Sequence, residues 1–410
     1  MKSKRRSSES MANNSDPPSP LGHNIIKDIL LRLPIKSIKR FESVSKAWYL
    51  LFNSHDFISN HFRRSSSGPS LLIRRFHNPT GSNFSIILMD NRTSIPREIK
   101  IPFLGSLIRY PKIIESCNGI ICLDISPCYA SAFVLWNIST RQFIGLPRPR
   151  INDAHKPIWM VATGFGYSRE SNDFKLVRVV NFHCNEDDSL VVRAEVYSWR
   201  TGSWMLLDGR MIEERMGSCV IPEGQQAVIV DGSMHWVANG VGKLANHKYI
   251  VSFEMGNEEF RRIKILDYLS SEICVKVVGF KESLALALYP ALSVYPGYGR
   301  PINRMELWTL DKDYASDVDG NCWTKLHTID LNSSGLNPIG VHNDSELLVK
   351  RMEAHCVSLS FFDPDNKGIK TLPICSSDYT CEFYSYVDSL VPVANAGYLE
   401  VEKTRESEIY

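Results

Sequence analysis

The feature that most constrains this chain is a pattern that returns five times along it. Each copy has a short apolar run with a central aromatic residue, a polar turn, and a second short run that ends in an apolar residue or proline. Five aromatic positions mark the copies at spacings of 54 to 63 residues: Trp136, Trp199, Phe253, Trp308 and Phe362. Short runs bounded by Gly, Asn, Asp and Pro indicate strands and turns. The chain from about Ser70 onward is therefore predicted to be a repeated, mostly β domain.

A second hairpin pattern precedes each of these copies. These hairpins lie near Cys117, Gly166, Asp231, Gly279 and His342. Four strands in each unit of roughly 50 residues indicate the blades of a β-propeller. A sixth unit can be assembled from SIILMDNRTSIPREIKI near the start of the domain and EFYSYVDSLVP near its end. We therefore expect six four-stranded blades over residues 70–393, with five or seven as alternatives because the blade boundaries in the stretch 291–302 are poorly marked.

The two ends of the chain have a different composition. Residues 1–20 are rich in Ser, Asn and Pro, with a basic cluster near the start, and we expect a disordered tail. This stretch has no apolar core of the kind that a signal peptide needs, so we expect a cytoplasmic and/or nuclear protein whose ten cysteines are reduced. Residues 394–410 are predicted to form a charged tail.

Residues 21–64 carry a helical pattern instead. Ile25, Ile26 and Ile29 begin an apolar face at helical spacing, and Pro34 must end that helix because proline has no amide hydrogen. A second short helix is expected over residues 35–44, with its inner side formed by Ile35, Ile38, Phe41 and Val44. A third is expected over residues 46–62, capped by Ser45, with Trp48, Leu51 and Phe52 turned inward. Three helices this short have more apolar residues than they can bury, so part of the apolar surface is expected to face a partner.

The same segment resembles a known module. The run ILLRLPIKSIKRF from Ile29, the run VSKAW from Val44 and the run DFI from Asp56 are similar to the F-box of the large plant F-box family. The resemblance implies a three-helix F-box that docks on a Skp-type adaptor and, through it, on a cullin. Gly22 stands where the family usually has proline, which predicts somewhat weaker docking because glycine leaves the helix start less ordered.

The repeated domain also resembles part of that family. NGIICL, LWNISTRQF, GFGYSRESNDFKLVRV, VYSWRTGSW and DGSMHWVA are similar to the kelch-like F-box-associated domain of plant F-box proteins. The expected architecture is thus α+β and multi-domain, with a small helical F-box before an all-β propeller. Substrate contact is expected on propeller loops, and the candidates are residues 151–157, 181–189 and 291–304.

Sequence motifs of common catalytic, metal-binding and phosphate-binding sites are absent from the chain. It contains no nucleophile elbow, no HExxH, no phosphate-binding P-loop, no EF-hand loop and no CxxC pair. His235 is predicted to be a hydrogen-bonded strand residue, the tryptophans of the repeat are predicted to pack between blades, and Asp187 and Asp188 are predicted to lie in a solvated loop. SDVDGNCW, from Ser316 to Trp323, is interpreted as a hairpin turn. We therefore expect no catalytic residue, no metal and no cofactor.

The resemblance implies that this chain is a non-catalytic subunit of a Skp-cullin-F-box ubiquitin ligase. Its partners would be the adaptor and an unknown substrate protein held by the propeller; a net charge of +2 predicts no nucleic-acid partner, and no apolar stretch is long enough to span a membrane. The predicted adaptor-binding residues are Leu21, Ile25, Ile29, Leu30, Leu33, Pro34, Ile35 and Trp48. The alternatives are a propeller lectin or glycosidase-like domain, and an F-box scaffold that does not ligate ubiquitin.

Overall fold

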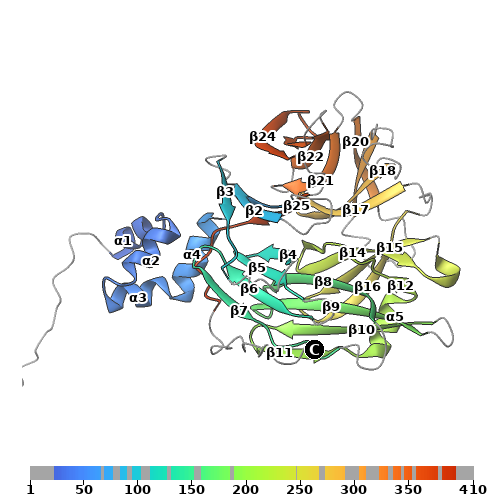
Figure 1. The fold of residues 1–410 in the computed structure, drawn as a ribbon, viewed down its shortest axis with the longest axis horizontal. Helices are drawn as coiled ribbons and strands as arrows, with labels where there is room; N and C mark the ends of the chain where they lie inside the picture. The colour runs from blue at the N-terminus through green and yellow to red at the C-terminus, as the bar shows by residue number, and fades with distance from the viewer. Residues whose placement is uncertain are drawn as a thin grey trace, which may run out of the picture.

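The structure is a computed structural model that describes most of the chain between His23 and Val393. The described ranges are 23–65, 69–76, 84–89, 95–102, 111–126, 131–151, 158–184, 189–245, 247–266, 273–290, 304–310, 323–330, 336–342, 346–352, 357–376 and 381–393. A small helical module lies at one end of a large β domain, with α4 between the other helices and the strands (Figure 1). The expected tails, 1–20 and 394–410, lie outside the described residues.

The helical module contains four described helices. They are α1 (His23–Leu30), α2 (Ile35–Phe41), α3 (Lys46–Phe52) and α4 (His55–Ser65). After α1 the chain tightens, because the amides of Arg32 and Leu33 bond to carbonyls only three residues back. Pro34 then begins the next helix rather than continuing the first, as the missing amide hydrogen predicts.

The third predicted helix, over residues 46–62, is two helices in the structure. Ser45 caps it as expected, with Oγ accepting from the amide of Trp48 at 3.2 Å. However, the helix ends at Phe52, and α4 begins at His55. Ser54 causes the break, since its hydroxyl donates to the carbonyl of Leu51 at 2.7 Å and accepts from the amide of Phe57 at 3.3 Å. One side chain thus closes α3 and caps α4, which gives four helices instead of three.

The described strands of the β domain form six antiparallel sheets, and the predicted six-bladed propeller is confirmed. Blade 1 joins β25 (Cys381–Tyr386) to β1 (Ser70–Phe76), β2 (Phe84–Met89) and β3 (Pro96–Ile99). Blade 2 contains β4 (Lys112–Cys117), β5 (Ile120–Asp124), β6 (Phe133–Asn137) and β7 (Gln142–Gly145). Blade 3 contains β8 (Ile158–Ser168), β9 (Asp173–Cys184), β10 (Ser189–Ser198) and β11 (Ser203–Leu206).

The other three blades complete the ring. Blade 4 contains β12 (Cys219–Val220), β13 (Val228–Val230), β14 (Ser233–Gly240), β15 (Lys248–Glu254) and β16 (Glu259–Lys264), with β12 and β13 both paired to β14. Blade 5 contains β17 (Ile273–Phe280), β18 (Ser283–Pro290), β19 (Arg304–Leu310) and β20 (Trp323–Asp330). Blade 6 contains β21 (Leu336–His342), β22 (Glu346–Met352), β23 (Val357–Phe362) and β24 (Ile369–Ser376). Helix α5 (Gly209–Met216) joins blade 3 to blade 4, and the short helix η1 (Gly242–Leu244) follows β14.

Two segments far apart in the sequence close the propeller. β25 pairs antiparallel with β1, placing Leu72 opposite Tyr384 and Ile73 opposite Phe383. Blade 1 therefore takes its first strand from the end of the domain and three strands from its start. This is the closure that the sequence predicted, and it makes the ring depend on residues beyond 380.

The propeller has two different faces. Because neighbouring strands run antiparallel, the turns from first to second strand and from third to fourth strand lie at one face, which we call the turn face. Several of its turns are two-residue hairpins with both residues at positive φ, among them Asn118–Gly119, Asp231–Gly232 and Lys281–Glu282. The links between blades and from second to third strand lie at the opposite face, which we call the linker face.

This geometry positions the helical module. β25 is a first strand, so it ends at the turn face, and the residues that follow it, 387–393, run along that face. We call residues 387–393 the strap. The helices lie at the same end of the propeller, and α5 lies toward the opposite end (Figure 1). The helical module and the linker face are therefore at opposite ends of the molecule.

Candidate functional site

The outer surface of α1 carries two large apolar side chains in solvent. Ile25 and Ile29 lie one helical turn apart and are 53% and 50% exposed. The next residue, Leu30, is buried in the core of the module. An amphipathic helix in a monomer normally turns such residues inward, so this exposed pair indicates a surface for a partner.

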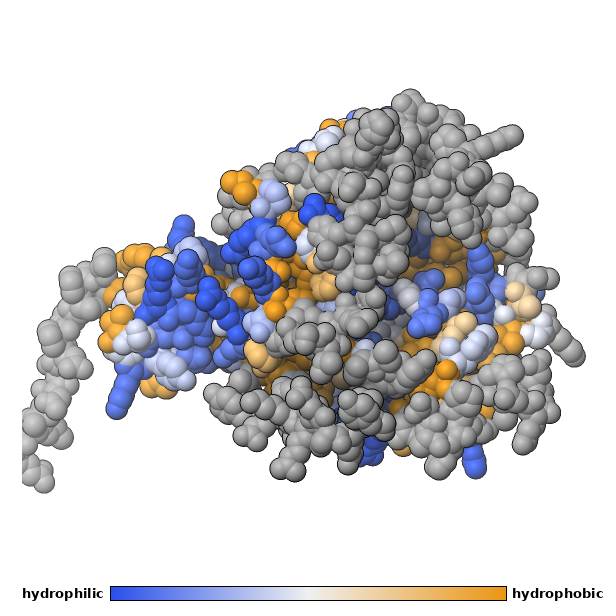
Figure 2. Space-filling view, in the orientation of Figure 1, coloured by the Kyte–Doolittle hydropathy of each residue, from blue (hydrophilic) through white to orange (hydrophobic). Residues whose placement is uncertain are grey.

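Four more exposed apolar residues lie on α2, on α3 and between them. Val44, Tyr49 and Leu50 are all more than half exposed, and Phe41 is 36% exposed. With the α1 pair they form what we call the exposed apolar set: Ile25, Ile29, Phe41, Val44, Tyr49 and Leu50. Figure 2 shows apolar residues at the margins of the helical module, around a strongly hydrophilic area. So small a module with this much exposed apolar surface is typical of a docking element.

Beneath this surface lies a compact aromatic core. Trp48 packs edge-on against both Phe41 and Phe52, with ring centroids 5.4 Å and 5.8 Å away, and Phe52 packs against Phe57 at 5.2 Å. Leu30, Ile35, Ile38, Phe52 and Phe57 are buried. The core fixes the spacing of α1, α2 and α3, and so holds the exposed side chains in place.

The structure divides the predicted adaptor-binding residues into three groups. Ile25, Ile29 and Pro34 are exposed; Leu33 and Trp48 are half-buried; Leu30 and Ile35 are core residues. Leu21, like Gly22, lies outside the described residues. Leu30 and Ile35 are thus placed to support the surface rather than to form it. The contact itself stays a prediction.

Sequence reasoning missed part of the exposed set. The helical pattern assigned Phe41 and Val44 to the inner side, and it did not single out Tyr49 or Leu50. The clue was in α3, where Tyr49 and Leu50 are followed by Leu51 and Phe52: four consecutive bulky residues cannot all face one core. Trp48, Leu51 and Phe52 were expected to turn inward, which left Tyr49 and Leu50 as the pair that faces solvent.

Ion pairs tie α1 to α4 next to the exposed residues. Asp28 accepts from Arg64 at 2.7 Å and from Arg32 at 2.9 Å, and Lys27 pairs with Asp56. The hydrogen bond from Arg64 and then that from Arg32 lower the pKa of the Asp28 carboxyl. The hydrogen bond from Lys27 likewise lowers the pKa of Asp56. These pairs are solvent-exposed, so they orient the helices more than they stabilise them.

The strap joins the helical module to the propeller. The side chain of Leu390 is 3% exposed and belongs to the hydrophobic core of the helical module, not to the propeller core. Three residues further on, Val393 is equally buried but packs in the core between blades 2 and 3. The strap therefore has one anchor in each domain.

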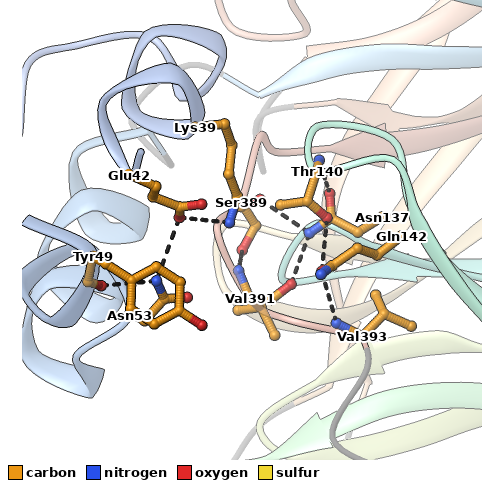
Figure 3. A network of polar contacts seen from close by, with 10 residues as sticks. All are labelled: Lys39, Glu42, Tyr49, Asn53, Asn137, Thr140, Gln142, Ser389, Val391 and Val393. Carbon is orange, nitrogen blue, oxygen red and sulfur yellow. Dashed lines mark hydrogen bonds and ion pairs between the residues drawn. The ribbon is translucent and has the colours of Figure 1, made fainter. Parts of the chain in front are cut away.

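Polar contacts from blade 2 hold the strap in place, as Figure 3 shows. Asn137 Nδ2 donates to the carbonyl of Ser389 at 3.0 Å and to that of Val391 at 2.9 Å, and its Oδ1 accepts from the amide of Thr140 at 3.1 Å. Gln142 Oε1 accepts from the amide of Val393 at 3.3 Å. The strap was predicted as part of the propeller, and its contact with the helices was not foreseen.

His235 and three tryptophans of the repeat are buried in the propeller. His235 is buried, with Nδ1 2.6 Å from Ser252 Oγ, and burial lowers its pKa to about 4. Trp204, Trp236 and Trp323 are buried, and their indole N–H groups donate to Pro147, Thr163 and Lys264 respectively. The predicted packing of tryptophans between blades is confirmed for these three residues.

The three candidate loops lie mostly outside the described residues. The described residues that flank them, Ile151 with Ile158, Cys184 with Ser189, and Pro290 with Arg304, lie at the linker face by strand order. Asp187, Asp188 and residues 316–322 are also outside. Among the residues that the structure does describe, no group of three or more His, Cys, Asp or Glu side chains could hold a metal ion. No helix in that part of the chain is long and apolar enough to cross a membrane.

Comparison with known proteins identifies both domains. Residues 82–393 match the F-box associated beta propeller domain family, and residues 19–60 match the F-box domain family. This chain belongs to the plant F-box proteins that carry an F-box-associated propeller. The helical module is thus the F-box. The match to the propeller family ends at Val393, so the strap lies within the family domain.

Individual relatives match this chain over most of their length. F-box protein CPR1 of Arabidopsis thaliana is 26% identical over 397 residues, covering 90% of this chain and 88% of that protein. F-box protein At4g22390 of the same plant is 23% identical over 390 residues, covering 90% and 89%. Among solved structures, TolB from Acinetobacter baumannii matches 81% of this chain and 70% of its own, at 11% identity and a TM-score of 0.42. At this identity and TM-score, the likeness says nothing about the function of this chain.

Proposed function

We propose that this F-box protein is the substrate receptor of a Skp-cullin-F-box ubiquitin ligase. The exposed apolar set of the F-box is the observation that carries the proposal. It offers a partner six large apolar side chains that stay in solvent although the F-box has a buried core beneath them. A Skp-type adaptor would cover these residues, and the propeller would hold the protein to be ubiquitinated.

The chain contributes proximity in this proposal rather than bond chemistry. A substrate bound to the propeller would be held near the ubiquitin-charged enzyme that the cullin carries, which raises the effective concentration of its lysines. The linker face is the proposed substrate surface, since it lies at the end of the propeller away from the F-box. The sites of action we propose are the cytoplasm, the nucleus or both.

The structure suggests which substitutions test adaptor docking. Replacing Leu33 and Pro34 would disturb the fold as well, because Leu33 packs on the F-box core and Pro34, which has no amide hydrogen, separates α1 from α2. Ile25 and Ile29 are better targets, because both are about half exposed and truncation leaves little cavity. The variant is the double substitution Ile25→Ala/Ile29→Ala.

A matched control is available on the propeller. Leu326 and Ile369 are 41% and 42% exposed on β20 and β24, so Leu326→Ala/Ile369→Ala removes comparable apolar surface outside the F-box and the strap. Calorimetry with a purified Skp-type adaptor should give a dissociation constant at least about tenfold weaker for the F-box variant and unchanged for the control. Equal affinity of both variants and the unmodified chain would contradict docking through α1.

Ubiquitin transfer needs its own measurement. Adaptor, cullin and this chain, reconstituted with the ubiquitin-charging enzymes, should ubiquitinate a protein captured by the propeller, and the Ile25→Ala/Ile29→Ala variant should not support transfer at limiting concentration. Adaptor binding without transfer to any captured protein would favour the scaffold alternative. Capture of glycans instead of protein would favour the lectin alternative.

A further inference from the structure

The F-box core is not built from the F-box alone. Its buried cluster of Leu30, Ile35, Ile38, Phe52 and Phe57 is completed by Leu390, which lies more than 320 positions further along the chain. Leu390 is 3% exposed, as deeply buried as the helical residues around it. A side chain supplied from outside a small helical module contributes a large share of its apolar burial, because such a module has little core of its own.

The position of Leu390 is set by the propeller. Asn137, fully buried at the end of β6, donates to the carbonyls on both sides of Leu390, those of Ser389 and Val391. Ser139 Oγ donates to Asp388 at 2.6 Å. Neither Asn137 nor Ser139 belongs to the F-box, so blade 2 fixes the backbone on both sides of Leu390; Figure 3 shows the contacts of Asn137 with this backbone.

The strap also depends on ring closure. It follows directly from β25, whose pairing with β1 completes blade 1. Tyr386, the last residue of β25, is buried and hydrogen-bonds through its hydroxyl to Ser139 at 2.8 Å. The same blade 2 turn therefore contacts the end of the closing strand and the start of the strap.

We infer that the strap completes the F-box core and makes the adaptor-binding conformation of the F-box conditional on a closed propeller. Leu390 inserts into the F-box core only when β25 is paired and Asn137 holds the adjoining carbonyls. In a chain whose propeller ring is open, the F-box sequence is unchanged, but its core lacks the side chain of Leu390. The strap also holds the two domains in a fixed relation, which sets where a substrate on the propeller would lie relative to the adaptor. The adaptor part of this inference rests on the proposed function; the coupling between the domains does not.

Hydrogen exchange in the full-length chain tests the coupling without any adaptor. Leu390→Ala should speed amide exchange in α2 and α3 at least about tenfold, because a core side chain is lost. Leu390→Met, which keeps most of the apolar volume, should restore most of the protection. Val393→Ala is the matched control: this residue is in the same strap and equally buried, but packs in the propeller, so exchange should rise in blades 2 and 3 and not in the F-box.

A substitution outside both the F-box and the strap makes the test sharper. Asn137→Ala should raise exchange in α2 and α3 about fivefold or more, although Asn137 has no hydrogen bond to an F-box residue among its described contacts. Asn181→Ala, at a second fully buried asparagine on blade 3, should leave F-box exchange unchanged. Unchanged F-box exchange in both Leu390→Ala and Asn137→Ala would overturn the inference, and so would an equal rise in Val393→Ala.

Calorimetry with a purified Skp-type adaptor separates this inference from the proposed function. Leu390→Ala and Asn137→Ala should weaken binding at least about threefold, while Val393→Ala should not. If the unmodified chain fails to bind the adaptor but the exchange pattern holds, the proposed function fails and the coupling stands. If the adaptor binds all variants alike and F-box exchange is unchanged, the coupling fails and the proposed function stands.

Discussion

Gly119 and Ser389 approach so closely that no side chain fits between them. A β-carbon built on Gly119 would lie 2.2 Å from the β-carbon of Ser389 and 2.6 Å from the carbonyl oxygen of Val387. Gly119 has a φ of +78° in the two-residue turn between β4 and β5. Glycine is thus required here both by the backbone conformation and by the strap that crosses the turn.

Gly119→Ala should therefore lift the strap from blade 2. We expect a loss of about 2–5 kcal/mol in the free energy of unfolding, which combines left-handed strain with overpacking. Gly202→Ala is the control, since Gly202 has a similar φ of +64° but open space around its β-carbon. It should cost only about 1–2 kcal/mol. Urea unfolding followed by tryptophan fluorescence measures both, and equal losses would contradict the close approach.

A buried ion pair holds the link between blades 2 and 3. Arg178 Nη1 lies 2.5 Å from Glu195 Oε1, and neither side chain is more than 1% exposed. Glu195 Oε2 also accepts from the amides of Arg150 and Ile151, at 2.7 Å and 3.1 Å. Arg178 donates to the carbonyl of Ile151 at 2.8 Å. The pair therefore anchors the backbone that leads into the linker face.

Removing one charge of this pair should destabilise the protein more than removing both charges. Arg178→Met leaves the Glu195 carboxylate buried without its cation and should lower the free energy of unfolding by about 3–5 kcal/mol. The double variant Arg178→Met/Glu195→Leu should lose less, about 1–3 kcal/mol, which is the cost of the unpaired backbone groups. Additive losses in a urea-unfolding double-mutant cycle would show that the two charges do not act as a pair.

The repeat and the ring closure could be predicted because they depend on local patterns. Each blade repeats its strand and turn signals at nearly constant spacing, and turns such as Asn118–Gly119 have a sequence signature. The segments SIILMDNRTSIPREIKI and EFYSYVDSLVP had no partners of their own, so combining them was the remaining way to close the ring. The strand β1, which pairs with both β25 and β2, was not singled out.

The contact of Leu390 with the F-box could not be predicted in this way. Its apolar run, SLVPV, reads equally well as the end of a propeller strand, and nothing local distinguishes Leu390 from Val393. The two side chains enter different domains because Asn137 fixes the path of the chain between them. Likewise, the break between α3 and α4 depends on the contacts of one serine, Ser54. Long-range contacts and helix breaks decide such details, and neither has a periodic signal.

The buried asparagines of neighbouring blades predict opposite responses to the same substitution. Asn137 and Asn181 are both fully buried, but neither amide atom of Asn181 has a hydrogen-bond partner, whereas Asn137 makes three hydrogen bonds. Asn181→Val should raise the free energy of unfolding by about 1–2 kcal/mol, because two desolvated polar groups are removed. Asn137→Val should lower it by about 2–4 kcal/mol. Urea midpoints that fall in both variants would show that Asn181 is satisfied in solution.

His235 should make the propeller sensitive to acid. Burial lowers the pKa of His235 to about 4 from an unfolded value of 6.5. The unfolded chain therefore binds more protons between pH 6.5 and 4, so stability falls as the pH falls through this window, by up to about 3 kcal/mol. His235→Gln keeps a hydrogen-bonding side chain next to Ser252 but cannot gain the charge. Its urea midpoint should decline less than that of the unmodified chain between pH 7 and 4.5, and an equal decline would contradict a buried neutral histidine.

Glu115 should act in the opposite direction over an overlapping pH range. Desolvation raises the pKa of this half-buried carboxyl to about 7 from 4.5, although the amide of Ser116 at 2.9 Å and Gln226 at 3.3 Å donate to it. The folded chain then binds more protons between pH 4.5 and 7, so the stability that Glu115 provides is present below pH 4.5 and is lost as the pH rises to 7. Glu115→Gln should leave the urea midpoint nearly unchanged at pH 4.5 and raise the free energy of unfolding by up to about 3 kcal/mol at pH 8.

In the unmodified chain, the stability that Glu115 provides at low pH partly cancels the stability that His235 loses there. The Glu115→Gln variant should therefore show a steeper fall toward acid than the unmodified chain, and a parallel pH profile would mean that Glu115 is ionised in the folded protein.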